Sequence, residues 1–138
     1  DMSIKYYNMA LLEGVKDVKI YTRLAMAYWE NNSVQDSIDC YNLAIETDPN
    51  YDIAQNNLGV IYLDTLNDVG RAMTLFKKAV ELNPNYTLAH FNLGRCHAKL
   101  NRKIDAANEF QRAIDLNKFT NELDEEIIQD KLFELFEA

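Results

Sequence analysis

The chain is poor in the residues that interrupt secondary structure. Its 138 residues include only 4 glycines and 2 prolines. This scarcity disfavours a sheet protein with many tight turns and favours long helices. No run of 18 apolar residues occurs, so we expect no membrane-spanning segment and no membrane partner. With 48% hydrophobic and 26% charged residues, the composition is that of a folded protein.

Cysteine and histidine, which build most metal and redox sites, are equally scarce. Cys40 and Cys96 have no CxxC neighbour, and we interpret them as buried apolar residues in a reduced intracellular compartment, in particular the cytoplasm. His90 and His97 lie seven residues apart, which is roughly 10 Å along a helix and too far for one metal ion. A glycine-rich phosphate loop is also lacking. These absences predict a protein that is not an enzyme and has no catalytic residue, metal or cofactor.

Positive charge is in deficit. The net charge is −8, and most of it falls at one end, since residues 109–138 hold nine carboxylates against three cations. An acidic protein gains nothing from counterion release at a phosphate backbone. We therefore expect no nucleic-acid partner.

What the sequence has instead is an internal repeat of 34 or 35 residues. An aromatic residue recurs at Tyr7, Tyr41, Phe76 and Phe110, and an alanine at Ala10, Ala44, Ala79 and Ala113. A leucine followed by a small residue recurs at Leu24-Ala25, Leu58-Gly59 and Leu93-Gly94. Near the end of each unit, two units have a proline and the third has a lysine at the same repeat position: Pro49, Pro84 and Lys118. A repeat of this length predicts a stack of supersecondary units.

This pattern resembles the tetratricopeptide repeat, which carries an aromatic residue, Leu-Gly, Tyr, Ala, Phe, Ala and Pro at fixed offsets. The resemblance implies an all-α fold, an α-solenoid of antiparallel helix pairs wound into a right-handed superhelix. Three full units would span residues 18–51, 52–86 and 87–120. Residues 1–17 would form the second helix of a partial unit and residues 121–138 a capping helix, within one array of residues 1–138.

Local signals predict the turns and the close contacts. Asparagine tolerates left-handed backbone, so we expect the first helices to end at Asn32, Asn67 and Asn101. Unit two has one extra residue, which we expect in the turn between Asp64 and Gly70. Gly59 and Gly94 are expected to make room for small residues of the second helices. These small residues are Ala72, Ala79, Ala106 and Ala113.

The two ends of the array are expected to differ. The last segment has an apolar stripe opposite an acidic face, as an end cap requires. The stripe consists of Leu123, Ile127, Ile128, Leu132, Leu135 and Phe136. At the other end no helix precedes residues 1–15, so Ile4, Tyr7 and Leu11 are expected to be exposed unless further chain or another molecule covers them. A homo-oligomer formed through this N-terminal helix is therefore an open alternative.

In the family that the sequence resembles, the first helices line a concave groove. The residues at those offsets are our candidates for binding a protein or peptide segment: Arg23, Met26, Ile53, Asn56, Asn57, Val60, Leu88, Phe91, Asn92 and Arg95. Exposed apolar residues along the groove indicate that a bound partner covers them. Packing between neighbouring first helices would also explain them.

Asn57 and Asn92 share one offset and resemble the asparagine ladder of O-GlcNAc transferase, whose amides grip a peptide backbone. An amide both donates and accepts, so it can pair with one peptide unit of any sequence. We expect both side chains to face solvent. Arg23 breaks the ladder in unit one, and packing around Leu-Gly is an alternative explanation. A carboxylate clamp for chaperone tails is not expected. Of its five positions, only Asn57 matches among Thr22, Met26, Asn57, Leu88 and Asn92.

The sequence thus favours a non-catalytic scaffold that binds a peptide or protein segment in the groove. Three alternatives stay open. The chain could be a regulatory or targeting arm of a larger enzyme, a chaperone that shields a client, or a self-assembling oligomer.

Overall fold

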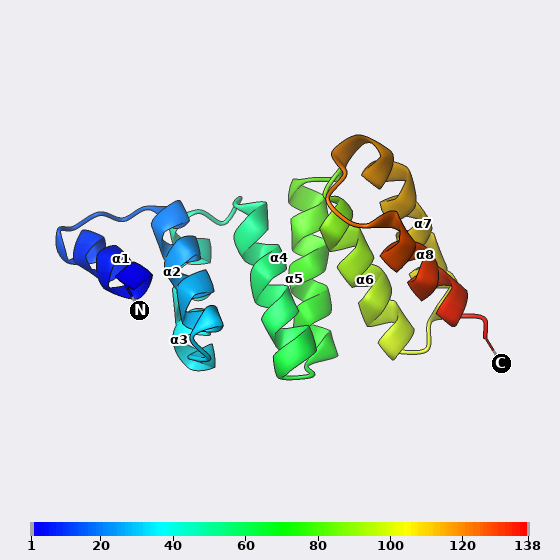
Figure 1. Ribbon diagram of the computed structural model, residues 1–138, viewed down its shortest axis with the longest axis horizontal. Coiled ribbons are helices and arrows are strands. Elements are labelled where there is room, and N and C mark those ends of the chain that lie inside the picture. The colour runs from blue at the N-terminus through cyan, green and yellow to red at the C-terminus, as the bar shows by residue number, and fades with distance from the viewer. Residues whose placement is uncertain (1, 138) are drawn as a thin grey trace.

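The computed structural model describes residues 2–137, and over this range the chain forms helices and no strand (Figure 1). The elements are α1 (Met2–Leu12), α2 (Val18–Glu30), α3 (Val34–Thr47), α4 (Asp52–Val60), η1 (Ile61–Thr65), α5 (Val69–Leu82), α6 (Thr87–Lys99), α7 (Lys103–Thr120) and α8 (Glu125–Glu134). The predicted all-α solenoid is confirmed. Within the described residues, no helix has the length and apolar character needed to cross a membrane.

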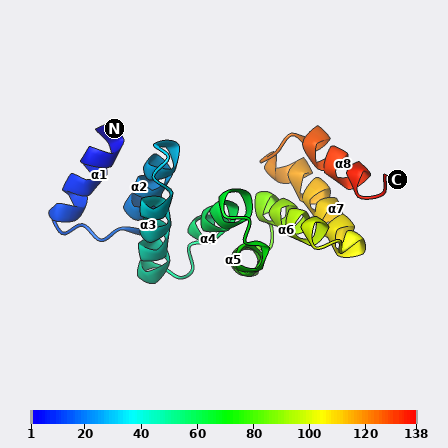
Figure 2. The ribbon, with the colours of Figure 1, turned by 90° about the horizontal axis from the view of Figure 1, so that it is seen from below.

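The helices follow one another as antiparallel pairs, α2/α3, α4/α5 and α6/α7, with α1 and α8 at opposite ends (Figure 1). Figure 2 shows that successive pairs are rotated relative to one another, so that the array bends instead of forming a flat row. The closest packing is between helices that are adjacent along the chain, as in other stacked repeat arrays.

The predicted asparagine turns are confirmed. The first helix of each pair is followed by an asparagine with positive φ, which is 61° at Asn32, 50° at Asn67 and 58° at Asn101. In each case the following residue donates its backbone N–H back to the helix, over distances of 2.9, 2.8 and 2.9 Å. The acceptors are the carbonyls of Tyr28, Tyr62 and His97. The left-handed conformation of the asparagine lets carbonyls of the last helical turn accept hydrogen bonds from these N–H groups.

We predicted that the extra residue of unit two lies in the turn between the helices, and this prediction is wrong. The extra residue is absorbed at the end of α4 by the π-helical turn η1, where Leu66 N–H donates to the carbonyl of Ile61 at 3.2 Å, five residues back. A π-turn widens the helix by one residue and keeps Asn67 in its capping place. One consequence is that Asp64 lies on the widened turn.

The second helices end where proline dictates. Helices α3 and α5 stop at Thr47 and Leu82, shortly before Pro49 and Pro84. Helix α7 has Lys118 at that place, so it continues to Thr120. The α7–α8 connection is then held by Asn117, whose side chain donates to the carbonyl of Leu123 at 2.7 Å and accepts from its N–H at 3.0 Å.

Each of the two repeat glycines faces an aromatic ring, not the small residues we had predicted. A Cβ on Gly59 would lie 2.6 Å from the Phe76 ring, and one on Gly94 would lie 2.5 Å from the Phe110 ring. Both rings are fully buried. The first pair has Ala25 at this place, buried in the same cluster as Tyr41. The predicted large–small complementarity therefore exists, but the large partner is the repeat's own aromatic residue.

Helix α8 covers α7 at the C-terminal end. Ile128 and Leu135 are buried in one cluster with Phe91 and Phe110, and Leu123 and Leu132 pack against it. The predicted stripe is wrong at two positions, because Ile127 and Phe136 are exposed.

At the N-terminal end the exposed face of α1 differs from the predicted one. Ile4, Tyr7 and Leu11 are partly buried against the core around α2 and α3. No described residue of α1 is fully buried. The opposite face exposes its large apolar side chains instead: Met2, Tyr6, Met9 and Leu12. The physical reason is that only the stripe of α1 with Ile4, Tyr7 and Leu11 can pack against α2 and α3. The other apolar stripe of α1 therefore stays exposed to solvent.

Candidate functional site

A pocket opens between the first helices of the pairs. It has a volume of about 210 Å³, and we refer to it as the inner pocket. Its lining consists of Met26, Trp29 and Glu30 from α2, Tyr41 from α3, Asn56, Asn57, Val60 and Ile61 from α4 and η1, and Leu88 from α6. Five of the ten candidate residues meet there: Met26, Asn56, Asn57, Val60 and Leu88.

The inner pocket has an apolar body and a polar edge. Met26 and Trp29 are 44% and 38% exposed. Both lie on α2, which has helices on either side of it in the array, so their exposure is not due to a position at its end. Asn57 and Glu30 supply the polar edge. A pocket of this kind accepts an apolar side chain while offering a hydrogen bond to the backbone that carries it.

The other five candidates lie elsewhere. Arg23 lines a shallow depression between α1 and α2 of about 220 Å³, together with Ser3 and Tyr7. Ile53 is exposed at the start of α4. Phe91 is buried in the C-terminal core, where its ring centroid lies 5.5 Å from that of Phe110.

Asn92 does not face solvent, and that prediction was wrong. Its side chain is 2% exposed. It donates to Asn56 Oδ1 at 3.1 Å and accepts from Arg95 Nη1 at 3.2 Å. Asn56 is itself fully buried and donates to Asn57 Oδ1 at 3.5 Å. The first helices α4 and α6 approach closely, so the amides of Asn56 and Asn92 hydrogen-bond to one another and Asn92 is not available to a peptide.

The same network extends to Asp64 through Arg95. Arg95 forms an ion pair with Asp64 on η1, so one arginine joins the widened turn of unit two to α6. The two residues are 31 apart in sequence. Asp64 and Arg95 both occupy groove-facing offsets of adjacent units, and this shared position could have predicted the ion pair. We did not predict it because we did not expect the inserted residue to form a π-helical turn.

Asn57 is the one ladder residue that stays accessible. It is partly buried at the pocket edge and forms a side-chain hydrogen bond with Tyr41. Burial raises the pKa of Tyr41 to about 12, and the bond to Asn57 opposes this shift only in part. The phenol is therefore neutral near pH 7 and acts as a hydrogen-bonding group, not as an ionised one.

The cysteines are buried and free, as predicted. Burial raises the pKa of the Cys40 and Cys96 thiols to about 11 in each case, so both stay protonated near neutral pH. A protonated, buried thiol is a poor nucleophile and a poor metal ligand. Among residues 2–137, no group of three or more histidine, cysteine and acidic side chains is arranged to hold a metal ion.

His90 joins three segments. Its Nδ1 lies 2.8 Å from Glu109 Oε2 on α7, and its Nε2 lies 2.8 Å from the carbonyl oxygen of Pro84. Burial alone would lower the pKa of His90, but the hydrogen bonds to Glu109 and Pro84 outweigh it and the pKa is raised. The imidazole is thus a structural cross-link between α6, α7 and the preceding turn.

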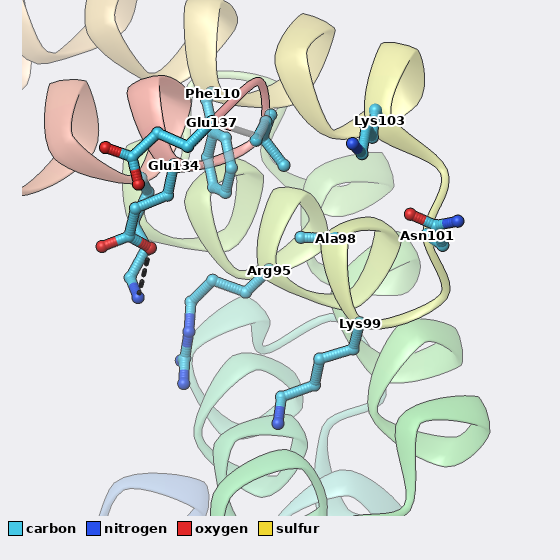
Figure 3. Close-up of a pocket in the computed structure, with 10 residues that line it drawn as sticks. Arg95, Ala98, Lys99, Asn101, Lys103, Phe110, Glu134 and Glu137 are labelled. Atoms are coloured by element: carbon cyan, nitrogen blue, oxygen red, sulfur yellow. Dashed lines mark hydrogen bonds and ion pairs between the residues drawn. The ribbon is translucent and has the colours of Figure 1, made fainter.

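A second pocket lies between α6, α7 and α8 and has a volume of about 430 Å³ (Figure 3). We refer to it as the C-terminal pocket. Its lining differs in kind from that of the inner pocket, since most of its residues are charged or polar. They are Arg95, Ala98, Lys99, Asn101, Lys103, Phe110, Lys131, Glu134, Leu135 and Glu137. Of the sequence candidates, only Arg95 is among them.

Comparisons with known proteins agree with this architecture. Two sequence profiles described as tetratricopeptide repeat match residues 22–87 and 75–107. No curated protein matches the chain. Among solved structures, the first TPR of Spaghetti (RPAP3), bound to HSP90 peptide SRMEEVD, is 21% identical. The alignment covers 86% of this chain and 90% of that one, with a TM-score of 0.77.

Two structures of MamA are similar to the same degree. One is 19% identical with a TM-score of 0.78, and the alignment covers 87% of this chain and 70% of that one. The other is 20% identical with a TM-score of 0.74, covering 88% and 67%. At these identities the similarity concerns the fold.

Proposed function

Because the chain belongs to the tetratricopeptide repeat family, we propose that it is a scaffold that binds a segment of a partner protein across α2, α4 and α6. The observation that carries this proposal is the inner pocket. Met26 and Trp29 are exposed large apolar residues that line this pocket. Large apolar side chains that stay exposed beside a polar hydrogen-bonding edge are typical of binding surfaces.

The structural relatives support the coarse form of this proposal. The first TPR of Spaghetti (RPAP3) holds an HSP90 peptide in its structure, so an array of similar extent has room for a short segment. The clamp positions of this chain do not favour the same ligand. Thr22 is buried, with its hydroxyl 2.7 Å from the carbonyl of Val18, and Asn92 is committed to Asn56. We therefore propose a segment that is not held by a terminal carboxylate clamp.

The test compares Met26→Glu with Leu43→Glu. Both residues are apolar and similarly exposed, at 44% and 42%, but only Met26 lines the inner pocket. In affinity capture from cell extract, proteins retained by the wild-type chain should be lost with Met26→Glu and kept with Leu43→Glu. Equal loss, or no loss, in the two variants would contradict binding at the inner pocket.

Trp29 provides an independent readout. It is the only tryptophan in the sequence and lines the inner pocket. A bound segment should shield the indole, shift its emission to shorter wavelength and reduce quenching by iodide. A captured partner that leaves both signals unchanged binds elsewhere.

Self-association is the second candidate, and one observation favours it. The outer face of α1 exposes Met2, Tyr6, Met9 and Leu12, an apolar stripe at helical spacing. Light scattering across a concentration series tests this candidate. Wild-type chain should form a dimer that Tyr6→Glu abolishes, and a strict monomer at high concentration rules the candidate out.

A further inference from the structure

We propose that the partner segment is apolar where it enters the inner pocket and acidic where it reaches the C-terminal pocket. This inference rests on the proposed function, since it specifies the chemistry of the segment that the groove accepts. The two pockets share α6, which contributes Leu88 to the first and Lys99 to the second. A segment that crosses α2 and α4 and then follows α6 from Leu88 toward Lys99 would meet both.

The charge distribution supports the acidic end. The chain has a net charge of −8 and only 14 cations, yet four of these cations line the C-terminal pocket: Arg95, Lys99, Lys103 and Lys131. Figure 3 shows Arg95 and Lys99 leaving the same side of α6. A local concentration of cations in an acidic protein attracts a carboxylate of a partner and also sets its orientation.

Two of these four cations have no carboxylate partner within the part of the chain that the structure describes. Arg95 is paired with Asp64, and Lys131 lies 3.4 Å from Glu134 on the same helix. Lys99 and Lys103 form no ion pair with any of residues 2–137. Both are exposed at the pocket wall. They are the groups that a carboxylate of the partner would pair with.

The opposite wall restricts where that carboxylate can lie. Glu134 at the end of α8 and Glu137 just beyond it line the pocket, and Figure 3 shows them on the side away from Lys99 and Lys103. Like charges repel, so an acidic side chain is directed to the α6–α7 wall. Phe110 and Leu135 are buried apolar residues of the same lining.

The spacing of the two pockets sets the length of the segment. Leu88 and Lys99 are 11 residues apart on one helix, which is roughly 16 Å of axial rise. An extended chain covers about 3.3 Å per residue. The apolar anchor and the acidic residue should therefore be separated by about five residues.

The experiment uses three labelled peptides of about twelve residues, acetylated and amidated so that no terminal charge contributes. Each has two leucines, a spacer of about five serine and glycine residues, and then two glutamates, two lysines or two serines. Fluorescence anisotropy measures binding to the full chain. The glutamate peptide should bind roughly tenfold more tightly than the lysine peptide, and the gap should shrink with salt because the lysines are exposed.

Matched charge reversals locate the effect. Lys99→Glu with Lys103→Glu should remove the preference for the glutamate peptide. Lys16→Glu with Lys77→Glu changes the net charge equally at exposed positions outside both pockets and should keep the preference. Glu134→Gln should strengthen binding of the glutamate peptide. If both double variants act alike, or if the three peptides bind equally, the acidic preference is overturned.

The outcome separates this inference from the proposed function. Three peptides that bind equally, and that Met26→Glu weakens equally, leave the groove in place as a binding site and remove only the acidic preference. If no peptide binds although capture of proteins depends on Met26, the proposed chemistry is wrong and the scaffold stands. If capture is also independent of Met26, both are wrong.

Discussion

The junction between α2 and α4 and the junction between α4 and α6 use the same repeat positions in opposite ways. At the first, Asn57 borders an open pocket beside Met26. At the second, its counterpart Asn92 is buried and hydrogen-bonded on both sides, to Asn56 and Arg95. The difference teaches that a motif position becomes a candidate binding group only where the neighbouring unit leaves it accessible. Asn56 and Arg95 close the second junction, and among residues 2–137 no equivalent pair of side chains closes the first.

The largest expected effect comes from Gly94→Ala, which would break the closed junction by moving α6. The new Cβ would lie 2.5 Å from the buried Phe110 ring, and overpacking of this kind costs ~1–3 kcal/mol. Gly70→Ala is the control, because its nearest neighbour lies at an ordinary 3.7 Å. Urea unfolding should show a clear loss for Gly94→Ala and no loss for Gly70→Ala. Equal stability of the two variants would mean that the ring contact is easily relieved.

The next effect contrasts the two asparagines directly. Asn92→Ala leaves the buried Asn56 oxygen without its 3.1 Å donor, and an unsatisfied buried polar group costs ~1–3 kcal/mol. Asn57→Ala changes a partly exposed side chain and should stay within ~0.5 kcal/mol, while it weakens binding at the inner pocket. Chemical unfolding and peptide anisotropy on both variants measure the contrast. Identical stability losses would show that the two junctions are equally packed.

A smaller effect is expected for the ion pair that completes the closed junction. Asp64 and Arg95 are partly exposed, with side-chain exposures of 40% and 24%, so solvent screens the pair and it contributes ~0.2–1 kcal/mol. A double-mutant cycle of Asp64→Asn and Arg95→Gln measures the coupling, and high salt should reduce it. Coupling that does not change with salt would mean that the pair is more buried than its exposure suggests.

The smallest effect concerns pH. Because the pKa of His90 is raised in the folded chain, its contribution to stability is fully present below the unfolded value of about 6.5. That contribution is lost as the pH rises through the folded pKa. The unfolding free energy, measured from pH 5.5 upward, should therefore decrease as the pH passes from about 6.5 through the folded pKa of His90. His90→Gln should remove that part of the slope, and an unchanged slope would assign the pH dependence to other groups.

The sequence revealed the helix boundaries well because they depend on local chemistry. Asn32, Asn67 and Asn101 adopt the left-handed conformation that their residue type tolerates, and the helices before Pro49 and Pro84 end as expected. Burial was harder to predict. Phe91 and Asn92 share groove-facing offsets with accessible residues of other units, and only the approach of α4, α7 and α8 buries them.

By itself the sequence determined the repeat, its all-α architecture and its turns, because periodicity and capping act over a few residues. Tertiary structure decided which side chains of the groove stay free. The π-helical turn η1 carries Asp64, which pairs with Arg95, and α8 turns the end of α6 into the wall of a charged pocket. The physical reason is that exposure and pairing depend on groups more than thirty residues away in sequence, and only the packing of neighbouring units brings those groups together.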